Sequence, residues 1–271
     1  MIFSFQLNSY AQVNMVMDSS FEQFDTCGFV FNSFNHLLFW MNPTPTTPDA
    51  LSPCNINSGG ILSAPSNGYG FEKAGSGLSY VGIDVYDLDN GNIEYICTHL
   101  RSNLVAGKKY FIWFYVSLAD SSDYAIDQLG VLFSTDSVLG ITSHYVIDST
   151  PQLISQSGWY LSDTSAWTKI SFYYTATGKE NYLIIGNFKD TSQTNHIYLH
   201  YSKNGYQYAY YYIDDVSVIE LPDTTAPTEP LIIPTYLTSQ NATWQIINLP
   251  VNTSVKIYNI IGQLLYGNDA Y

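Results

Sequence analysis

The chain has few charged residues and very few basic ones. Only 12% of its 271 residues are charged, and nine Lys and Arg stand against 23 Asp and Glu, so the net charge is −14. A protein this poor in basic residues does not attract nucleic acid or an anionic membrane surface. The excess of carboxylates instead favours cations such as Ca²⁺. We therefore expect no nucleic-acid partner, and a soluble extracellular protein.

Long apolar runs and common catalytic motifs are also missing. No stretch approaches the ~18 consecutive apolar residues of a membrane-spanning helix, and there is no G-x-S-x-G, H-E-x-x-H or phosphate loop. His196 and His200 lie four apart on a strand-like segment, which separates them by about 13 Å, too far for one metal site. No Asp or Glu sits in a motif tied to glycosidase chemistry. We expect no enzyme, with a glycoside hydrolase as the remaining catalytic alternative.

Cysteine is scarce, with only Cys27, Cys54 and Cys97 in the chain. No C-x-x-C is present, which argues against a zinc knuckle. In an oxidising compartment Cys27 and Cys54 are the expected disulfide pair, because both lie in loop-like sequence. Cys97 lies in strand-like sequence and is expected as a buried thiol. Other pairings stay open, since sequence spacing does not determine connectivity.

Aromatic residues are abundant, with 24 Tyr and 14 Phe in a chain that is 46% apolar. They gather with β-branched residues in short segments separated by turn-forming residues, a pattern typical of strands. These segments are residues 80–86, 93–100, 109–118, 129–134, 167–176, 182–188, 196–201 and 208–220. Strands at this spacing without convincing helices predict an all-β fold, a jelly-roll β-sandwich.

The segment 208–220 is expected to be the closing strand of the sandwich. It carries two adjacent carboxylates, Asp214 and Asp215. Neighbouring side chains on a strand point to opposite faces, so one of the two must face inward or lie at a bulge. An inward carboxylate needs a cation or several N–H donors.

The ends of the chain differ in composition from its middle. Residues 1–12 end near Ser9-Tyr10-Ala11, a pattern that suggests the remnant of a signal peptide, with an N-terminal strand as the alternative. Residues 13–221 hold the sandwich. The Pro-rich residues 222–234 are predicted to be a linker. Residues 235–271 contain three short strand candidates and are too few for a second sandwich, so they predict a partial small β domain.

Several short motifs resemble a family of secreted surface proteins of gliding-type bacteria. They are Phe21-Glu22, residues 65–71 (PSNGYGF), 79–83 (SYVGI), 115–120 (YVSLAD) and 212–218 (YIDDVSV). Their order is similar to that in galactose-binding-like jelly rolls that serve as carbohydrate-binding modules. The resemblance covers residues 13–221 and implies a non-catalytic, glycan-binding protein. A structural or adhesin-type surface protein that binds protein partners is the alternative.

The tail resembles the start of the gliding-motility-associated C-terminal domain, the sorting signal of type IX secretion. The similar segments are residues 243–250 (TWQIINLP), 255–259 (VKIYN), 262–266 (GQLLY) and 269–271 (DAY). The family's Pro-Asn-Gly-Asp-Gly turn is absent from residues 235–241, and strands expected after the last Tyr are missing, so the tail resembles a truncated domain. The resemblance implies a secreted, cell-surface-associated protein, with the secretion machinery and surface proteins as partners.

The resemblance also implies a structural Ca²⁺. In related modules the ion lies between the Phe-Glu strand and the Asp-Asp-Val strand, which here assigns Glu22 and Asp215 as ligands, completed by oxygens from residues 69–73. The alternative is that loop N–H groups satisfy the inward Asp and that Glu22 is a rim residue.

Aromatic rings stack on sugar faces, so aromatic residues in or beside predicted loops are the candidate glycan contacts. They are Trp40, Tyr69, Trp159, Tyr206, Tyr208 and Tyr210. The alternative for each is that it fills a face or an edge of the sandwich.

Overall fold

A computed structural model describes residues 12–28, 31–89, 91–137, 140, 145–199 and 207–222, together with four strands of the tail. Residues 12–221 form one compact unit. Within the described parts of the chain, no helix is long and apolar enough to cross a membrane. The predicted signal-peptide remnant lies almost wholly outside the described residues, as does Tyr206.

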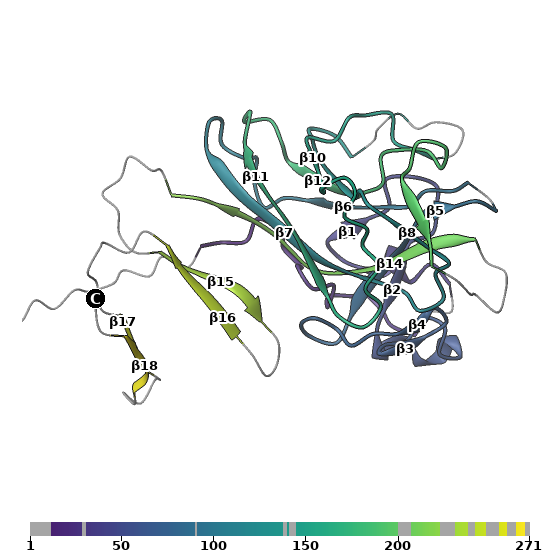
Figure 1. The fold of residues 1–271 in the computed structure, drawn as a ribbon, viewed down its shortest axis with the longest axis horizontal. Coiled ribbons are helices and arrows are strands. Elements are labelled where there is room, and N and C mark those ends of the chain that lie inside the picture. Colours follow the sequence, from purple (N-terminus) through teal and green to yellow (C-terminus); the bar gives the residue numbers. More distant parts are fainter. Residues whose placement is uncertain are drawn as a thin grey trace, which may run out of the picture. The chain divides into compact units, whose positions relative to one another are not determined.

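Two five-stranded antiparallel sheets build the compact unit (Figure 1). The first sheet has the order β1 (Trp40–Met41), β6 (Tyr95–His99), β12 (Tyr182–Gly186), β9 (Gly130–Ser134), β10 (Leu153–Ile154). The second sheet has the order β11 (Thr168–Thr175), β7 (Lys109–Leu118), β14 (Tyr208–Glu220), β5 (Tyr80–Asp87), β2 (Asp49–Leu51). Each of the eight segments predicted as strands between residues 80 and 220 overlaps an observed strand, and the predicted jelly-roll β-sandwich is confirmed.

Short elements complete the unit. The strand β8 (Tyr124–Ile126) pairs with β13 (His196–Tyr198), and β3 (Ser66–Asn67) pairs with β4 (Gly70–Phe71). Two 3₁₀ helices, η1 (Ser33–His36) and η2 (Pro53–Ser58), lie in the long segment before β5.

The side chains of β14 alternate between the interior, which lies between the two sheets, and the outer face of the second sheet. Tyr211 and Ile213 are fully buried in the cluster between the two sheets. The Tyr211 hydroxyl donates to the carbonyl oxygen of Leu161 at 2.8 Å and accepts from the N–H of Ile126 at 3.0 Å, so this deep phenol has both partners. Tyr212 points the other way, into a separate cluster on the outer face of the second sheet.

A loop covers part of that outer face. The Asn67 side chain accepts a 2.8 Å hydrogen bond from Tyr212 and donates to the Tyr80 hydroxyl at 3.1 Å. The indole N–H of Trp167 donates to the carbonyl oxygen of Lys73 at 2.8 Å. These bonds attach residues 67–73 to the second sheet and leave a hollow beside them, described below.

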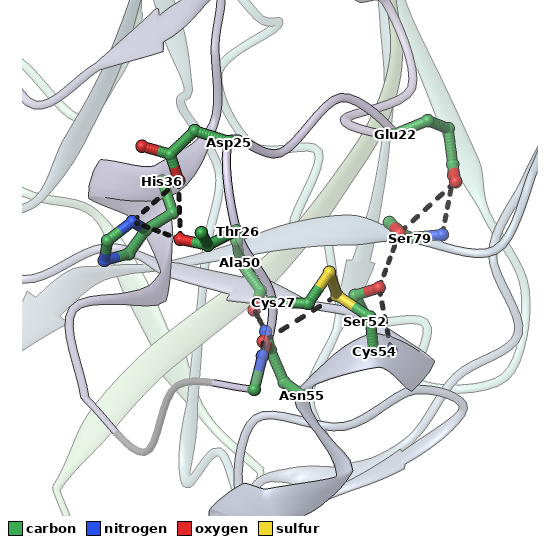
Figure 2. Close-up of a disulfide and its surroundings, with 11 residues drawn as sticks. Glu22, Asp25, Thr26, Cys27, His36, Ala50, Ser52, Cys54, Asn55 and Ser79 are labelled. Carbon is green, nitrogen blue, oxygen red and sulfur yellow. Dashed lines mark hydrogen bonds and ion pairs between the residues drawn. A yellow bond between two sulfur atoms is a disulfide. The ribbon is translucent and has the colours of Figure 1, made fainter.

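A disulfide joins Cys27 to Cys54, with 5.4 Å between their Cα atoms (Figure 2). It links the segment after Glu22 to η2. Asn55, next to Cys54, is fully buried and ties the same region together, accepting from the N–H of Gly28 at 3.2 Å and donating to the carbonyl oxygen of Ala50 at 3.0 Å. Cys97 is a buried free thiol.

Two hairpins lie in the tail. The strand β15 (Leu231–Leu237) pairs with β16 (Ala242–Ile247), and β17 (Val255–Tyr258) pairs with β18 (Leu264–Asn268). The strand β15 begins inside residues 222–234, so the prediction that this whole segment is linker is wrong. Proline lacks an N–H, and the strand accommodates Pro234 beside a register shift between Pro234 and Tyr236.

Candidate functional site

A pocket of about 450 Å³ opens on the outer face of the second sheet. Its lining comes from β2, β5, β14, the covering loop, the connection between β5 and β6, and the segments just before η1, before β2 and after η2. The lining residues are Phe31, Asn32, Thr47, Asp49, Ile61, Leu62, Tyr69, Asp84, Asp87, Asp89, Asn92, Glu94, Tyr208 and Tyr210. Carboxylates and phenols dominate the polar part of this wall.

A β-bulge in β5 places two of the acids together. Residues three apart on a regular strand point to opposite faces. Between Ala209 and Tyr210 of β14 the pairing with β5 shifts by one residue, so Tyr210 lies opposite Asp84 while Tyr208 lies opposite Asp87. The extra residue turns Asp87 back to the side that Asp84 occupies, and both line the pocket.

Tyr210 lies flat across the sheet and forms one wall of the pocket. Its ring stacks on that of Tyr69 with centroids 3.9 Å apart. Both hydroxyls donate to the same oxygen of Asp49, Tyr210 at 2.8 Å and Tyr69 at 2.9 Å. The Tyr210 ring passes over Gly82, the residue opposite Asp49 in the ladder, because only a glycine leaves room there.

Replacing Gly82 by Ala should therefore disrupt the pocket wall. The new methyl group would overlap the phenol of Tyr210, which Tyr69 and Asp49 hold in place. We expect a loss of about 1–3 kcal/mol in the free energy of unfolding, as for other overpacked sites, and a changed near-UV circular dichroism of the tyrosines. Gly140→Ala is the control, because a methyl group there meets only Asp148, at 3.9 Å. Equal stability of the two variants would contradict the geometry.

Glu94 connects the two sheets at the base of the pocket. Its N–H donates to the carbonyl oxygen of Asp84 at 2.8 Å, and its Oε2 accepts from the N–H of Asp84 at 2.9 Å. Its Oε1 accepts from the N–H of Thr47 at 3.0 Å. Burial raises the pKa of Glu94 to about 8. Burial also raises the pKa of Asp84 well above its usual value, and nearby Glu94 adds to that effect.

The pocket is strongly acidic. Five carboxylates line it, from Asp49, Asp84, Asp87, Asp89 and Glu94, and no Lys, Arg or His is among its described lining residues. These acids are spread around the wall. Across the residues that the structure describes, no group of three or more His, Cys, Asp and Glu side chains is placed to hold a metal ion.

The structure brings three of the six predicted glycan contacts together, since Tyr69, Tyr208 and Tyr210 all line the pocket. Trp159 is 44% exposed but does not line it. The prediction for Trp40 is wrong, because its ring is buried in the core against Phe21. Trp40 lies in β1 of the first sheet, and the segment that carries Asp18 and Phe21 contacts its ring.

Sequence reasoning missed the acids of the pocket. Asp84 and Asp87 stand in a strand whose other residues are mostly apolar. A charged residue within such a strand is a signal in itself, because a buried carboxylate needs a reason. Asp49 gives no such signal, since its tyrosine partner Tyr210 lies 161 residues away in the chain.

Glu22 and Asp215 meet the same loop, residues 75–79, away from the pocket. Glu22 Oε1 accepts from the N–H groups of Leu78 at 2.8 Å and Ser79 at 2.7 Å, as Figure 2 shows for Ser79. Asp215 accepts from the Ser76 hydroxyl. Burial, and then the negative charge of Glu22, raise the pKa of Asp215.

Asp214 is the more deeply buried carboxylate of the pair, on the same loop-covered outer face of β14 as Tyr212. It is fully buried, and its Oδ2 accepts from the N–H groups of Gly75 at 2.8 Å and Ser76 at 3.2 Å. Asp215 lies at the bulge, where its φ of 53° is left-handed and the pairing with β7 shifts between Asp214 and Ser217. The N–H groups of the loop thus donate to the more deeply buried acid.

No protein-family model matches the sequence, and no curated protein matches it. Solved structures that resemble the chain include carbohydrate-binding modules and adhesin domains. The K2 cleaved adhesin domain of Lys-gingipain is 14% identical, with a TM-score of 0.37, over 78% of this chain and 99% of that one. The xylan-binding CBM22-1 domain of Xyn10C from Paenibacillus barcinonensis is 13% identical, with a TM-score of 0.38, over 76% of this chain and 94% of that one. At these values the similarity does not identify what this chain binds.

Proposed function

We propose that the sandwich is a non-catalytic carbohydrate-binding module and that the pocket beside Tyr69 and Tyr208 is its sugar site. The observation that carries this proposal is an aromatic wall joined to hydrogen-bond acceptors in one concave site. Aromatic rings offer apolar faces to sugar C–H groups, while carboxylates and the Asn92 amide accept from sugar hydroxyls. A few convergent polar groups on an apolar wall are typical of small-molecule sites.

Calorimetry with a glycan library tests the proposal. Tyr208→Ala removes an aromatic wall residue and should weaken binding at least tenfold, which is about 1.4 kcal/mol. Tyr173→Ala is the matched control, because Tyr173 is 71% exposed and does not line the pocket. Equal affinity of the Tyr208 variant and the wild type for the glycan would show that this pocket is not the sugar-binding site. If no glycan binds and a protein ligand does, the adhesin-type alternative replaces the proposal.

Glycoside hydrolysis is the second candidate, because a buried acid with a raised pKa can act as a general acid. Glu94 is such a group. Both of its oxygens, however, accept backbone N–H groups, from Thr47 and Asp84, which supports a structural role. Release of reducing ends from a bound glycan, lost in Glu94→Gln, would favour the hydrolase.

We also propose that the protein is exported by type IX secretion and stays associated with the cell surface. The resemblance of the tail to a sorting domain supports this, and the tail forms the hairpins β15–β16 and β17–β18. The secretion machinery and other surface proteins would then be its partners.

A Ca²⁺ ion held by Glu22 and Asp215 stays a proposal. The mutual repulsion of these two carboxylates fits a cation between them. Ca²⁺ at a hundredfold excess over its dissociation constant should add about 2.7 kcal/mol to the free energy of unfolding, measured as a melting temperature that EDTA lowers. Asp215→Asn should abolish the response. A wild-type melting temperature that ignores both Ca²⁺ and EDTA would exclude the ion.

A further inference from the structure

We infer that the pocket selects glycans that carry a positively charged amino group over neutral and acidic glycans. This inference rests on the proposed glycan-binding function and names the class of sugar. It starts from the lining of the pocket, which holds five carboxyl groups and, among the described residues, no basic side chain. A concave site lined by one sign of charge concentrates ligands of the opposite sign and repels those of its own.

One of these acids has an open acceptor. Asp84 Oδ1 accepts a long bond from the N–H of Tyr86 at 3.3 Å, and no described residue donates to its Oδ2. Asp214, by contrast, has loop N–H donors on its side chain. An ammonium group offers three donors and a positive charge, which is the partner that an unsatisfied carboxylate in a pocket lacks.

The arrangement suits an organic cation better than a metal ion. No three of the described acids converge to hold a metal, whereas they surround about 450 Å³ of space. Tyr69 and Tyr208 line the same space, and phenol rings attract cations over their faces as well as stacking on sugars. A protonated amino sugar offers both a positive charge and a sugar face on which an aromatic ring can stack.

Binding of such a sugar should release protons. Burial raises the pKa of Asp49, Asp84 and Glu94, so these acids keep their protons to a higher pH than ordinary carboxyl groups, and a bound cation would favour the loss of those protons. The other titratable groups that face the pocket are Asp87, Asp89, Tyr69, Tyr208 and Tyr210. Affinity should therefore rise with pH through the range in which the acids ionise, as long as the amine keeps its charge.

The test compares three oligosaccharides of equal length by calorimetry, namely glucosamine, N-acetylglucosamine and cellulose oligomers, with putrescine as an amine that is not a sugar. We expect the glucosamine oligomer to bind at least tenfold more tightly than the other two oligosaccharides. Asp84→Asn should remove most of this preference, and Asp89→Asn serves as a second pocket variant should the first fail to fold. Asp148→Asn, an exposed acid outside the pocket, should keep it.

The outcomes separate the two proposals. Equal binding of charged and neutral sugars, or a preference that both pocket variants retain, overturns the inference and leaves the glycan-binding function standing. No binding of any glycan overturns the function itself. Binding of putrescine as tight as that of the glucosamine oligomer overturns the assignment of a sugar as the ligand.

Discussion

The free energy of unfolding of the wild-type protein should decrease as the pH rises from about 4.5 to about 8, and Glu94→Gln should make this decrease smaller. Burial raises the pKa of Glu94 from 4.5 to about 8 in the folded protein. Between these values the folded state keeps a proton that the unfolded state has lost, so the free energy of unfolding decreases with increasing pH. The full shift corresponds to about 5 kcal/mol at most.

Urea unfolding at several pH values measures this effect. Gln cannot accept from both Thr47 and Asp84, so the variant should lose about 1–2 kcal/mol at every pH. Its dependence on pH above 4.5 should nevertheless be shallower than that of the wild type. The remaining slope reports the other acids whose pKa values burial raises, among them Asp49, Asp84, Asp214 and Asp215. Parallel curves for variant and wild type would show that Glu94 does not titrate in this way.

Glu180 provides a control of opposite sign. Burial alone would raise the pKa of Glu180, but hydrogen bonds from the Tyr174 hydroxyl and the N–H of Thr177 outweigh it and lower the pKa to about 2. Its contribution is present above about 4.5 and is lost as the pH falls toward 2. Glu180→Gln should therefore change stability most at neutral pH and least in acid.

Removing the disulfide between Cys27 and Cys54 should cost about 3.5 kcal/mol of unfolding free energy. The bond closes a loop with a sequence separation of 27 residues, and the estimate follows from the conformational freedom that such a cross-link takes from the unfolded chain. The double Ser variant and the wild type would be compared by chemical unfolding with and without a thiol reductant.

The reductant supplies the internal control for this experiment. It should lower the unfolding midpoint of the wild type to that of the variant and leave the variant unchanged. A wild-type midpoint that does not respond to reduction, together with a variant of equal stability, would show that the bond adds nothing to stability. Cys97 does not compete in exchange in the folded state, because it is buried and burial raises the pKa of its thiol to about 12.

The local sequence pattern was sufficient to predict the strands and the sandwich fold. Aromatic and β-branched segments between turns predict β5, β7, β11 and β14, because such residues fit a pleated, half-buried surface. The same pattern shows that Asp214 and Asp215 cannot both lie on one regular face. Tyr208 and Tyr210 could be proposed as ligand contacts because they lie beside a predicted loop, at the start of the closing strand.

The contents of the pocket depended on tertiary structure. The bulge opposite Ala209 and Tyr210 turns Asp87 to the side of Asp84, and a one-residue shift of this kind has no clear mark in the sequence. Asp49 becomes part of the site only because β2 pairs with β5 and Tyr210 crosses Gly82 to reach it. Trp40 is not a ligand contact because its ring is buried in the core against Phe21. Sequence alone thus determined which segments are strands, since that is a local property of side chains. Only the packed structure decided which acids and tyrosines share one pocket, because pairing register and close approach are set by residues far apart in the chain.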